Sequence, residues 1–371
     1  MAFGIFKKKK EEEKVAEVRT GYLNLKVKEV VRETSDAISI HFEQPTTGDI
    51  SYKSGQFFTL IAQVNGEEVR RAYSVCSSPY TDSLPAVAVK RVDGGKMSNY
   101  LNDELKAGQE MRVMEPNGNF TTDFDSGNDR HIVLFGGGSG ITPLISIAKS
   151  ALDQEPNTKV SLIYANRNID SIIFKAKLEA MVAESNGRFQ IVHVLEDNSG
   201  VLEAHTGRIT KEIIETSLAQ LPQYAANATE HFMCGPGPMM DTIAEALQAL
   251  GVADSQVRRE SFTSTASEKK EETASDSDEV VAREVTVLYD GDEYKYTVEP
   301  GETILEKGLE EDIDLPFSCQ SGLCTACRGK CMSGKVKMDE EEGLSEAEID
   351  EGYVLPCVSH PLTDDVVIEI G

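Results

Sequence analysis

Residues 319–327 read CQSGLCTAC, and one more cysteine, Cys357, follows much later in the chain. Cys319, Cys324, Cys327 and Cys357 therefore have the spacing C-x4-C-x2-C plus a distant C, which is typical of a [2Fe–2S] cluster held by four thiolates. The residues between the first two cysteines are small and include a glycine, so the backbone there can wrap a cluster and point N–H groups at its sulfurs. We expect these four cysteines to bind iron in a centre that moves one electron at a time.

Two other interpretations of the cysteines remain open. Four cysteines can also hold a structural zinc ion, although zinc ribbons usually pair two C-x2-C units and this stretch has one. Cys324, Cys327 and Cys331 read C-x2-C-x3-C, close to a bacterial cluster run, but that run continues with proline and here Met332 follows. We predict that Cys331 is a buried thiol that binds no metal.

Length and composition exclude several classes of protein. The chain has 371 residues, enough for two or three domains, and lacks an apolar run near the ~18 residues that a membrane span needs. Its net charge of −26 argues against nucleic acid as a partner. Seven cysteines, four of them expected as thiolate ligands, indicate a reducing compartment, so we expect a cytoplasmic protein.

The acidity is concentrated at the C-terminal end. Residues 283–371 contain 7 Lys+Arg and 22 Asp+Glu, a net charge of −15. Such a charge suits a small electron carrier that is steered to a basic docking patch on its partner, and it equally suits plain solubility. Just before it, residues 264–282 have almost no apolar side chains and are expected to form a flexible linker. Residues 1–20 read as a solvated tail, whose apolar start and lysine run allow at most a weak contact with an anionic surface.

The pattern changes once between the tail and the linker. Over residues 21–124, short alternating apolar runs separated by turn residues predict an antiparallel barrel or sandwich. Over residues 125–263, strands alternate with helices, which predicts a doubly wound α/β domain. The expected strands are 23–31, 37–42, 57–64, 86–92, 111–114, 131–135, 160–164, 189–195 and 231–234, and the expected helices are 143–152, 174–184, 211–219 and 238–250.

Two glycine-rich loops point to a nucleotide. Residues 136–143 read GGGSGITP between an apolar strand and a helix, where glycine lets the backbone approach a pyrophosphate and the helix N-terminus offers free N–H groups. Because Pro143 replaces the last glycine of G-x-G-x-x-G, an ordinary tight turn is the alternative. Residues 234–238 read CGPGP after another strand, so Cys234 is expected at the ligand-binding edge of the sheet, or simply buried before a turn.

The barrel half carries its own candidates. Arg71, Tyr73 and Ser74 lie on one expected strand, with Arg71 and Tyr73 on the same face and Ser74 on the other. Arginine suits a phosphate and tyrosine suits a flat heterocycle. Residues 94–98 (GGKMS) precede a short expected helix, whose start would also face a phosphate.

Taken in order, these motifs resemble the ferredoxin–NADP reductase family over residues 21–262 and a plant-type ferredoxin over residues 283–371. The resemblance implies a multidomain protein with an antiparallel β-barrel FAD domain (21–124), an α/β doubly wound NAD(P) domain (125–263), a linker (264–282) and a C-terminal α+β β-grasp ferredoxin domain (283–371). The order of these parts is similar to that of the reductase subunits of phenylacetyl-CoA epoxidases. Related reductases of this arrangement serve hydroxylases, desaturases or a hybrid-cluster protein.

The resemblance also implies roles for single residues. In the family, the residue matching Arg71 holds a flavin phosphate, that matching Tyr73 packs on the isoalloxazine, and that matching Ser74 lies near its reactive nitrogen. Tyr73, Ser74, Thr142 and Cys234 are the catalytic candidates, and Thr142 and Cys234 are expected to shape the hydride-transfer pocket rather than act as acid or base. The cofactor-binding candidates are Arg71, Tyr73, Ser74, Val89, Lys90, Gly95, Lys96, Met97, Ser98, Gly137, Gly138, Gly140, Thr142, Arg167, Cys234, Gly235, Pro236 and, in the E-x-F ending that starts at Glu260, Phe262.

Electron counting then gives the expected function. NAD(P)H supplies two electrons as a hydride and the cluster takes one, so FAD is needed to bridge the mismatch. We expect an NAD(P)H-dependent oxidoreductase that passes electrons through FAD and the [2Fe–2S] cluster to a metal-containing oxygenase. Arg167 is placed to meet the 2′-phosphate of NADPH, which favours NADPH over NADH, while Asp170 nearby weakens that preference.

Two rival functions differ in what they require of the sequence. An oxygenase or hydrolase with its own substrate has no support, because the sequence lacks H-E-x-x-H, G-x-S-x-G and P-loop motifs. A non-enzymatic redox sensor would use the cluster without NAD(P)H turnover, and flavin that fails to co-purify would favour it.

Overall fold

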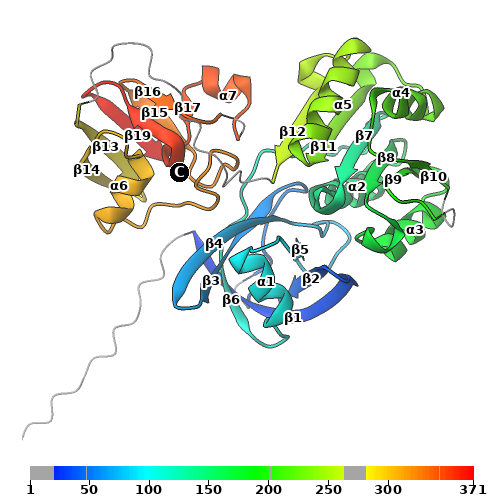
Figure 1. The fold of residues 1–371 in the computed structure, drawn as a ribbon, viewed down its shortest axis with the longest axis horizontal. Helices are drawn as coiled ribbons and strands as arrows, with labels where there is room; N and C mark the ends of the chain where they lie inside the picture. Colours follow the sequence, from blue (N-terminus) through cyan, green and yellow to red (C-terminus); the bar gives the residue numbers. More distant parts are fainter. Residues whose placement is uncertain (1–20, 47, 200–202, 263–280, 342) are drawn as a thin grey trace, which may run out of the picture.

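The computed structural model describes residues 21–46, 48–199, 203–262, 281–341 and 343–371. The expected tail and nearly all of the expected linker lie outside these residues. In the described part, three β-sheet units follow one another along the chain (Figure 1). No helix among the described residues is both long and apolar enough to cross a membrane.

The first unit is an antiparallel sheet with the strand order β4-β3-β6-β1-β2-β5. A bridge between Val75, just after β4, and Val87 in β5 joins the two ends of this order and closes a barrel. Phe42 and Phe58 meet edge to face inside it, with ring centroids 6.3 Å apart. Its elements are β1 (Tyr22–Thr34), β2 (Ala37–Phe42), β3 (Phe57–Val64), β4 (Glu67–Ser74), β5 (Ala86–Lys90), α1 (Lys96–Asp103) and β6 (Glu110–Met114).

The second unit is a parallel sheet with the strand order β10-β9-β8-β7-β11-β12. Helices α2 and α3 pack on one face and α4 and α5 on the other, so the sheet is doubly wound. Its elements are β7 (His131–Gly137), α2 (Ile141–Gln154), β8 (Lys159–Asn166), α3 (Lys175–Glu184), β9 (Phe189–Leu195), β10 (Ala204–Thr206), α4 (Lys211–Gln220), β11 (Thr229–Gly235), α5 (Gly237–Ala249) and β12 (Val257–Ser261).

Helix α2 belongs to both of these units, because one side packs on the parallel sheet and the other on the barrel. Its buried side chains share one apolar core with Ala86 and Phe120 of the barrel. Ser146 donates a hydrogen bond to the backbone oxygen of Ser77 (2.6 Å), and Ser150 contacts the hydroxyl of Ser78 (2.7 Å). The hydroxyls of Ser146 and Ser150 are therefore satisfied inside the contact between the barrel and the α/β unit.

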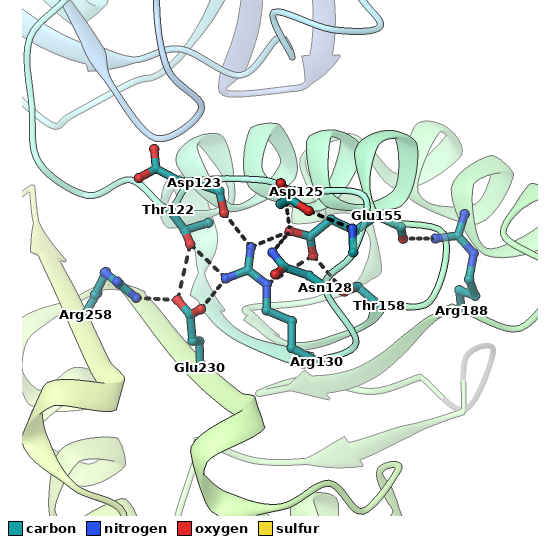
Figure 2. Close-up of polar contacts among 11 residues, drawn as sticks. Thr122, Asp123, Asp125, Asn128, Arg130, Glu155, Thr158, Arg188, Glu230 and Arg258 are labelled. Atoms are coloured by element: carbon teal, nitrogen blue, oxygen red, sulfur yellow. Dashed lines mark hydrogen bonds and ion pairs between the residues drawn. The ribbon is translucent and has the colours of Figure 1, made fainter.

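A buried ionic network fixes the amino ends of the parallel strands (Figure 2). Arg130, directly before β7, forms two hydrogen bonds with Glu155 (2.7 and 3.0 Å) and pairs with Glu230 of β11. Glu155 is fully buried and also accepts a hydrogen bond from Thr158 (2.7 Å). Arg258 of β12 completes the network at Glu230 (2.6 Å). These contacts tie the segment that leaves the barrel to three elements of the α/β unit.

The third unit is a sheet with the strand order β14-β13-β19-β15-β17, in which β13 and β19 run parallel. Helix α6 packs on it, as in a β-grasp fold, and β16 pairs with β18 beside it. The three-part architecture expected from the sequence is thereby confirmed. The elements are β13 (Arg283–Tyr289), β14 (Asp292–Val298), α6 (Ile304–Glu310), β15 (Gly329–Ser333), β16 (Val336–Met338), α7 (Glu346–Asp350), β17 (Tyr353–Val354), β18 (Ser359–Pro361) and β19 (Val366–Ile370).

Two strands of the α/β unit were not expected from the sequence. β10 has only three residues, and β12 reads VRRES, which carries three charges in five residues. Both are edge strands, so one side of each is not covered by the sheet and the apolar pattern that identifies buried strands is missing.

Candidate functional site

The four cysteines predicted to bind iron converge in the third unit. Cys319, Cys324 and Cys327 lie in the loop between α6 and β15, and Cys357 lies in a short 3-10 turn, η5 (Pro356–Val358). Cys319 hydrogen-bonds with both Cys324 and Cys357, and Cys357 also contacts Cys327. The four sulfurs thus form one continuous group, drawn together from two separate segments of the chain.

These contacts move the thiol pKa values apart. Hydrogen bonds with Cys324 and Cys357 lower the pKa of Cys319, whereas the hydrogen bond to Cys319 and burial raise the pKa values of Cys324 and Cys357. One thiolate is therefore stabilised by its neighbours, and a second negative charge is opposed. Removing the remaining protons requires positive charge in the middle of the group, which iron supplies.

The donor set consists of four thiols with the spacing of a [2Fe–2S] ligand set. Within the described ranges, no three His, Cys, Asp or Glu side chains surround a single point that could hold a metal ion. The sulfurs contact one another in a chain, Cys324 with Cys319, Cys319 with Cys357, and Cys357 with Cys327. A [2Fe–2S] cluster takes two thiolates on each of two irons, and four cysteines with this spacing would supply them.

The loop around the cluster site is tightly folded. The backbone N–H of Ser321 donates to the sulfur of Cys319 (3.4 Å), which is the N–H···S contact expected from the small residues there. Gly322 has a φ of +72°, and a Cβ at this position would lie 2.7 Å from the Cβ of Glu340. A side chain at Gly322 would therefore push the loop away from the segment that covers it.

Cys331 lies apart from this group, on β15. Its thiol contacts the backbone oxygens of Ser333 (3.2 Å) and Gly334 (3.8 Å). The expectation that it is buried was wrong, since it is half-buried. The reason is that burial decreases along β15, from the buried Gly329 at its start to the exposed Met332 and Ser333 at its end.

The predicted nucleotide loops border a cavity of about 590 Å³ at the carboxyl edge of the parallel sheet. One wall comes from the barrel through Lys90, and the others come from the ends of β7, β8, β9 and β11. Among the predicted cofactor-binding residues, those that line it are Lys90, Gly137, Gly138, Arg167, Gly235, Pro236 and Phe262. A cavity of this size suits a dinucleotide fragment at the edge where α/β sheets bind ligands.

The glycines of the two loops are required by packing as well as by any ligand. A Cβ on Gly140 would lie 2.0 Å from the backbone oxygen of Cys234, so the loops touch at this point. Gly138 has a φ of +54° and faces the Lys90 ammonium. Thr142 is buried in the first turn of α2, where its hydroxyl donates to the backbone oxygen of Ser139 (3.1 Å). Its position under the loop is compatible with shaping the pocket, and its catalytic role stays a prediction.

The predicted flavin residues lie on and around β4. Arg71 is exposed, while Tyr73 packs against the barrel core and burial raises its pKa. Ser74, at the end of the strand, is buried and faces the α/β unit. An exposed guanidinium and a phenol with one covered face are the groups that a flavin phosphate and ring require.

In the second predicted flavin segment, residues 89–98, backbone N–H groups rather than side chains are available to bind a phosphate. The side chains of Val89 and Met97 are in the barrel core, and Lys96 forms an ion pair with Glu67 (2.6 Å). Ser98 accepts a hydrogen bond from the N–H of Val92 (3.1 Å). Helix α1 starts after Gly95 without a side-chain cap, so its first N–H groups suit a phosphate.

Glu260 is the site residue that the sequence reasoning missed. It lies on β12 opposite Cys234 of β11 and accepts a hydrogen bond from Ser74 of the barrel (3.1 Å). Burial raises the pKa of Glu260 to about 8, and burial together with the nearby Glu260 raises the pKa of Cys234. These three side chains join the flavin strand to the nucleotide sheet. Glu260 was visible in the sequence as the glutamate of the E-x-F ending, but nothing in the local sequence indicated that Ser74 would be its hydrogen-bond partner.

Arg167 borders the same cavity at the end of β8. Its guanidinium pairs with Asp36 of the barrel (2.7 Å). Although burial opposes it, the hydrogen bond from Thr34 and the charges of Lys90 and Arg167 lower the pKa of Asp36. The cation is therefore at the cavity, as expected, but in this structure it is held by a carboxylate that a 2′-phosphate would have to replace.

Three family models match successive parts of the chain. They describe an oxidoreductase FAD-binding domain (residues 23–122), an oxidoreductase NAD-binding domain (134–245) and a 2Fe-2S iron-sulfur cluster binding domain (287–362). Each falls within the corresponding unit of the structure.

Curated relatives match over nearly the whole chain. The ferredoxin reductase component of 3-ketosteroid-9-alpha-monooxygenase from Rhodococcus rhodochrous is 39% identical, over 93% of this chain and 96% of its own length. One of the subunits of 1,2-phenylacetyl-CoA epoxidase from Escherichia coli is 34% identical, over 94% of this chain and 98% of its own length. Among solved structures, phthalate dioxygenase reductase has the same fold, with a TM-score of 0.55 and 21% identity over 94% of this chain and 98% of that one. The chain belongs to the family of reductase components of multicomponent oxygenases, NAD(P)H-dependent oxidoreductases that carry FAD and a [2Fe–2S] cluster.

Proposed function

We propose that this protein is the reductase component of a multicomponent monooxygenase and that its acidic cluster domain docks on a basic patch of the oxygenase. The observation that carries the NAD(P)H-to-flavin step of this function is the hydrogen bond between Ser74 and Glu260, which joins the predicted flavin strand to the nucleotide sheet. With both sites at one junction, the donor and the flavin come together where water is largely excluded.

In this proposal, some residues bind the cofactors and others orient them. Tyr73 and Ser74 hold and orient the flavin ring, the backbone of α1 and Arg71 bind its phosphates, and the loops at Gly138 and Gly235 bind the dinucleotide. When bound, FAD accepts a hydride from NAD(P)H and gives up electrons singly to the cluster. Cys234 is buried next to the nucleotide loops, and because burial raises the pKa of its thiol it would remain neutral where the nicotinamide binds.

Exposed carboxylates of the cluster domain support the docking proposal. Asp339, Glu341, Asp350 and Glu351 are exposed on the segments that follow the cluster loop. A basic patch on the oxygenase would be attracted to these carboxylates, and the attraction would weaken with salt. All seven cysteines are thiols rather than disulfides, which supports our assignment of the protein to the cytoplasm.

Two relatives name candidate acceptors. The steroid monooxygenase reductase and the phenylacetyl-CoA epoxidase relative match nearly the same length of this chain. Purified protein should therefore be mixed with each oxygenase component, NADPH and the matching substrate, and product formation should be measured at increasing ionic strength. We expect turnover with one of the two that falls as salt rises, and turnover independent of salt would contradict the docking proposal.

The cofactor content has a direct test that does not need the partner. An anaerobic visible spectrum should show flavin and cluster absorbance, both of which bleach on addition of NADPH. A colourless protein that contains zinc would overturn the proposal.

We propose NADPH as the preferred donor because Arg167 lies at the cavity. Replacing Arg167 with alanine should raise the KM for NADPH about tenfold, since one charge-assisted contact to phosphate is lost. The KM for NADH serves as the internal control and should change by less than about twofold. Equal effects on both nucleotides would show that Arg167 does not read the 2′-phosphate.

A further inference from the structure

A buried arginine connects the barrel with the cluster domain. Arg70 precedes Arg71 on β4, yet only 6% of its surface is exposed. It lies against the segment that leads into the cluster loop, and Figure 1 shows the cluster domain beside the edge of the barrel formed by β4 and β3. An arginine is rarely buried to this extent without paired charges, so its partners need an explanation.

Arg70 is bound from both domains. In the barrel, it donates to Glu68 (2.9 Å) and to the hydroxyl of Tyr22 (3.2 Å). From the cluster domain, it pairs with Asp314 (3.1 Å), and its guanidinium lies 4.3 Å from the ring centroid of Phe317. A charge pair and a cation–π contact to the same short segment hold both the position and the orientation of that segment.

The segment held by Arg70 leads directly to an iron ligand. Asp314 and Phe317 precede Cys319 on the same short loop, and Arg70 is followed on its strand by the predicted flavin residues Arg71 and Tyr73. The contact therefore links the polypeptide next to the flavin site with the polypeptide next to the cluster site.

A second contact lies on the other side of the cluster loop. Thr325, between Cys324 and Cys327, reaches Asn117 of the barrel (3.4 Å). Asn119 contacts Glu348, which pairs with Arg328 (2.5 Å). All these contacts are polar or cationic, so each group can be solvated when the domains separate, and the interface suits repeated docking rather than permanent association.

We propose that Arg70, Asp314 and Phe317 form a docking latch that positions the cluster for electron transfer from the flavin. This inference rests on the proposed function, and it assigns to Arg70 a positioning role. One electron moves across the latched interface without any bond being made or broken: the reduced flavin is oxidised by one electron and the cluster is reduced by one. The electrons come from NAD(P)H.

If the latch acts as proposed, variants that break it should slow electron transfer from the flavin to the cluster and leave flavin reduction unchanged. Arg70→Met and Asp314→Asn should each slow cluster reduction at least about tenfold, because removing one partner of a buried charge pair strongly weakens docking. Flavin reduction by NADPH should stay within about twofold of the unmodified protein, since neither residue contacts the nucleotide cavity. Both steps are measured by anaerobic stopped-flow absorbance, with the flavin content of each variant determined first.

Matched controls separate the latch from general charge effects. Asp364→Asn removes an exposed carboxylate of the same domain that pairs with Arg283, and Lys53→Met removes an exposed cation of the barrel that pairs with Asp123. Both should leave cluster reduction within about twofold. The double variant Arg70→Asp with Asp314→Arg restores opposite charges and should recover part of the rate that either single reversal loses.

A second readout does not depend on turnover. In hydrogen–deuterium exchange, residues 313–318 and residues 68–72 should both lose protection in Arg70→Met and Asp314→Asn, and in neither control. Cluster reduction and exchange that match the unmodified protein in both variants would overturn the latch. A protein whose flavin is not reduced by NAD(P)H at all would instead overturn the proposed function, and the exchange measurement would still decide on the latch.

Discussion

Glu260 controls the charge at the junction of the flavin and nucleotide sites. Burial raises its pKa to about 8, so at neutral pH the carboxyl is mostly protonated and neutral. Above that pKa it becomes an anion beside Cys234 and the hydroxyl of Ser74. A negative charge there opposes the arrival of a hydride, which brings further negative charge.

The rate of flavin reduction should therefore fall as pH rises through about 8. Glu260→Gln keeps the shape and the neutral state, so its rate should be nearly independent of pH over the same range. Stopped-flow flavin reduction at saturating NADPH measures both profiles. A variant that retains the full pH dependence would assign it to another group.

At the same scale, the cysteines allow a sharp comparison. Cys357→Ser should abolish the cluster signal in electron paramagnetic resonance and lower the iron content, because a ligand from the second chain segment is lost. Cys331→Ser should leave both unchanged, since its thiol contacts the backbone at Ser333. Loss of the cluster in Cys331→Ser would require a different ligand set.

The sequence patterns predicted where motifs lie along the chain, but they did not predict which distant residues contact one another. The C-x4-C-x2-C run (residues 319–327) and the GGGSGITP loop (residues 136–143) each lie within one segment, so both could be predicted from the sequence alone. The pairing of Ser74 with Glu260, and of Arg70 with Asp314, joins residues far apart in sequence. No local pattern encodes such a contact, because it depends on how the barrel meets the other two units.

At the scale of elements, long apolar strands were predicted closely and charged edges were not. β2, β3 and β9 have the predicted bounds, because their apolar side chains are buried in a core. β12 was missed because its charged residues are stabilised by partners, such as Glu230 for Arg258. The same strand carries Glu260, so the missed element and the missed site residue have one cause.

The network in Figure 2 should be a main determinant of the stability of the α/β unit. Glu155→Gln removes the fully buried charge beside Arg130, which keeps Glu230 as its other charged partner, and should lower the free energy of unfolding by about 1.5–3 kcal/mol. Glu179→Gln, which removes an exposed pair with Lys175, should cost less than about 1 kcal/mol. Urea unfolding followed by circular dichroism measures both.

The difference in unfolding free energy between the unmodified protein and Glu155→Gln should depend on pH. Burial opposes ionisation of Glu155, but hydrogen bonds from Arg130, Thr158 and Asn128 lower its pKa below 4.5. A lowered folded-state pKa gives stability that is present above the unfolded-state pKa and is lost as pH falls through the folded-state value. The advantage over Glu155→Gln should therefore shrink in acid, and a constant difference would argue against the ion pair as its source.

At the scale of the whole molecule, the barrel and the α/β unit share one core and are expected to move and unfold together, while the cluster domain has a core of its own. Helix α2 is buried in the same core as Ala86 and Phe120 of the barrel, whereas the described contacts of the cluster domain with the barrel are polar pairs and a cation–π contact. A shared core couples unfolding, and separate cores do not.

Differential scanning calorimetry of the holoprotein should accordingly resolve two transitions rather than three. The flavin and nucleotide units should melt together, and Arg70→Met should shift neither transition by more than a few degrees, because docking contributes little to either core. Three separate transitions would contradict the shared core.

The shared helix α2 also restricts how this enzyme can change shape during turnover. Hinge motion between the flavin and nucleotide units would expose Ile147 and break the hydroxyl contacts at Ser146 and Ser150, at a cost that recurs in every catalytic cycle. When the cluster domain moves away from the barrel, by contrast, its polar contacts are replaced by hydrogen bonds to water, which costs less. The slow conformational step of such a protein is therefore expected where the electron leaves it, while the site that the nucleotide enters keeps a fixed shape from one cycle to the next.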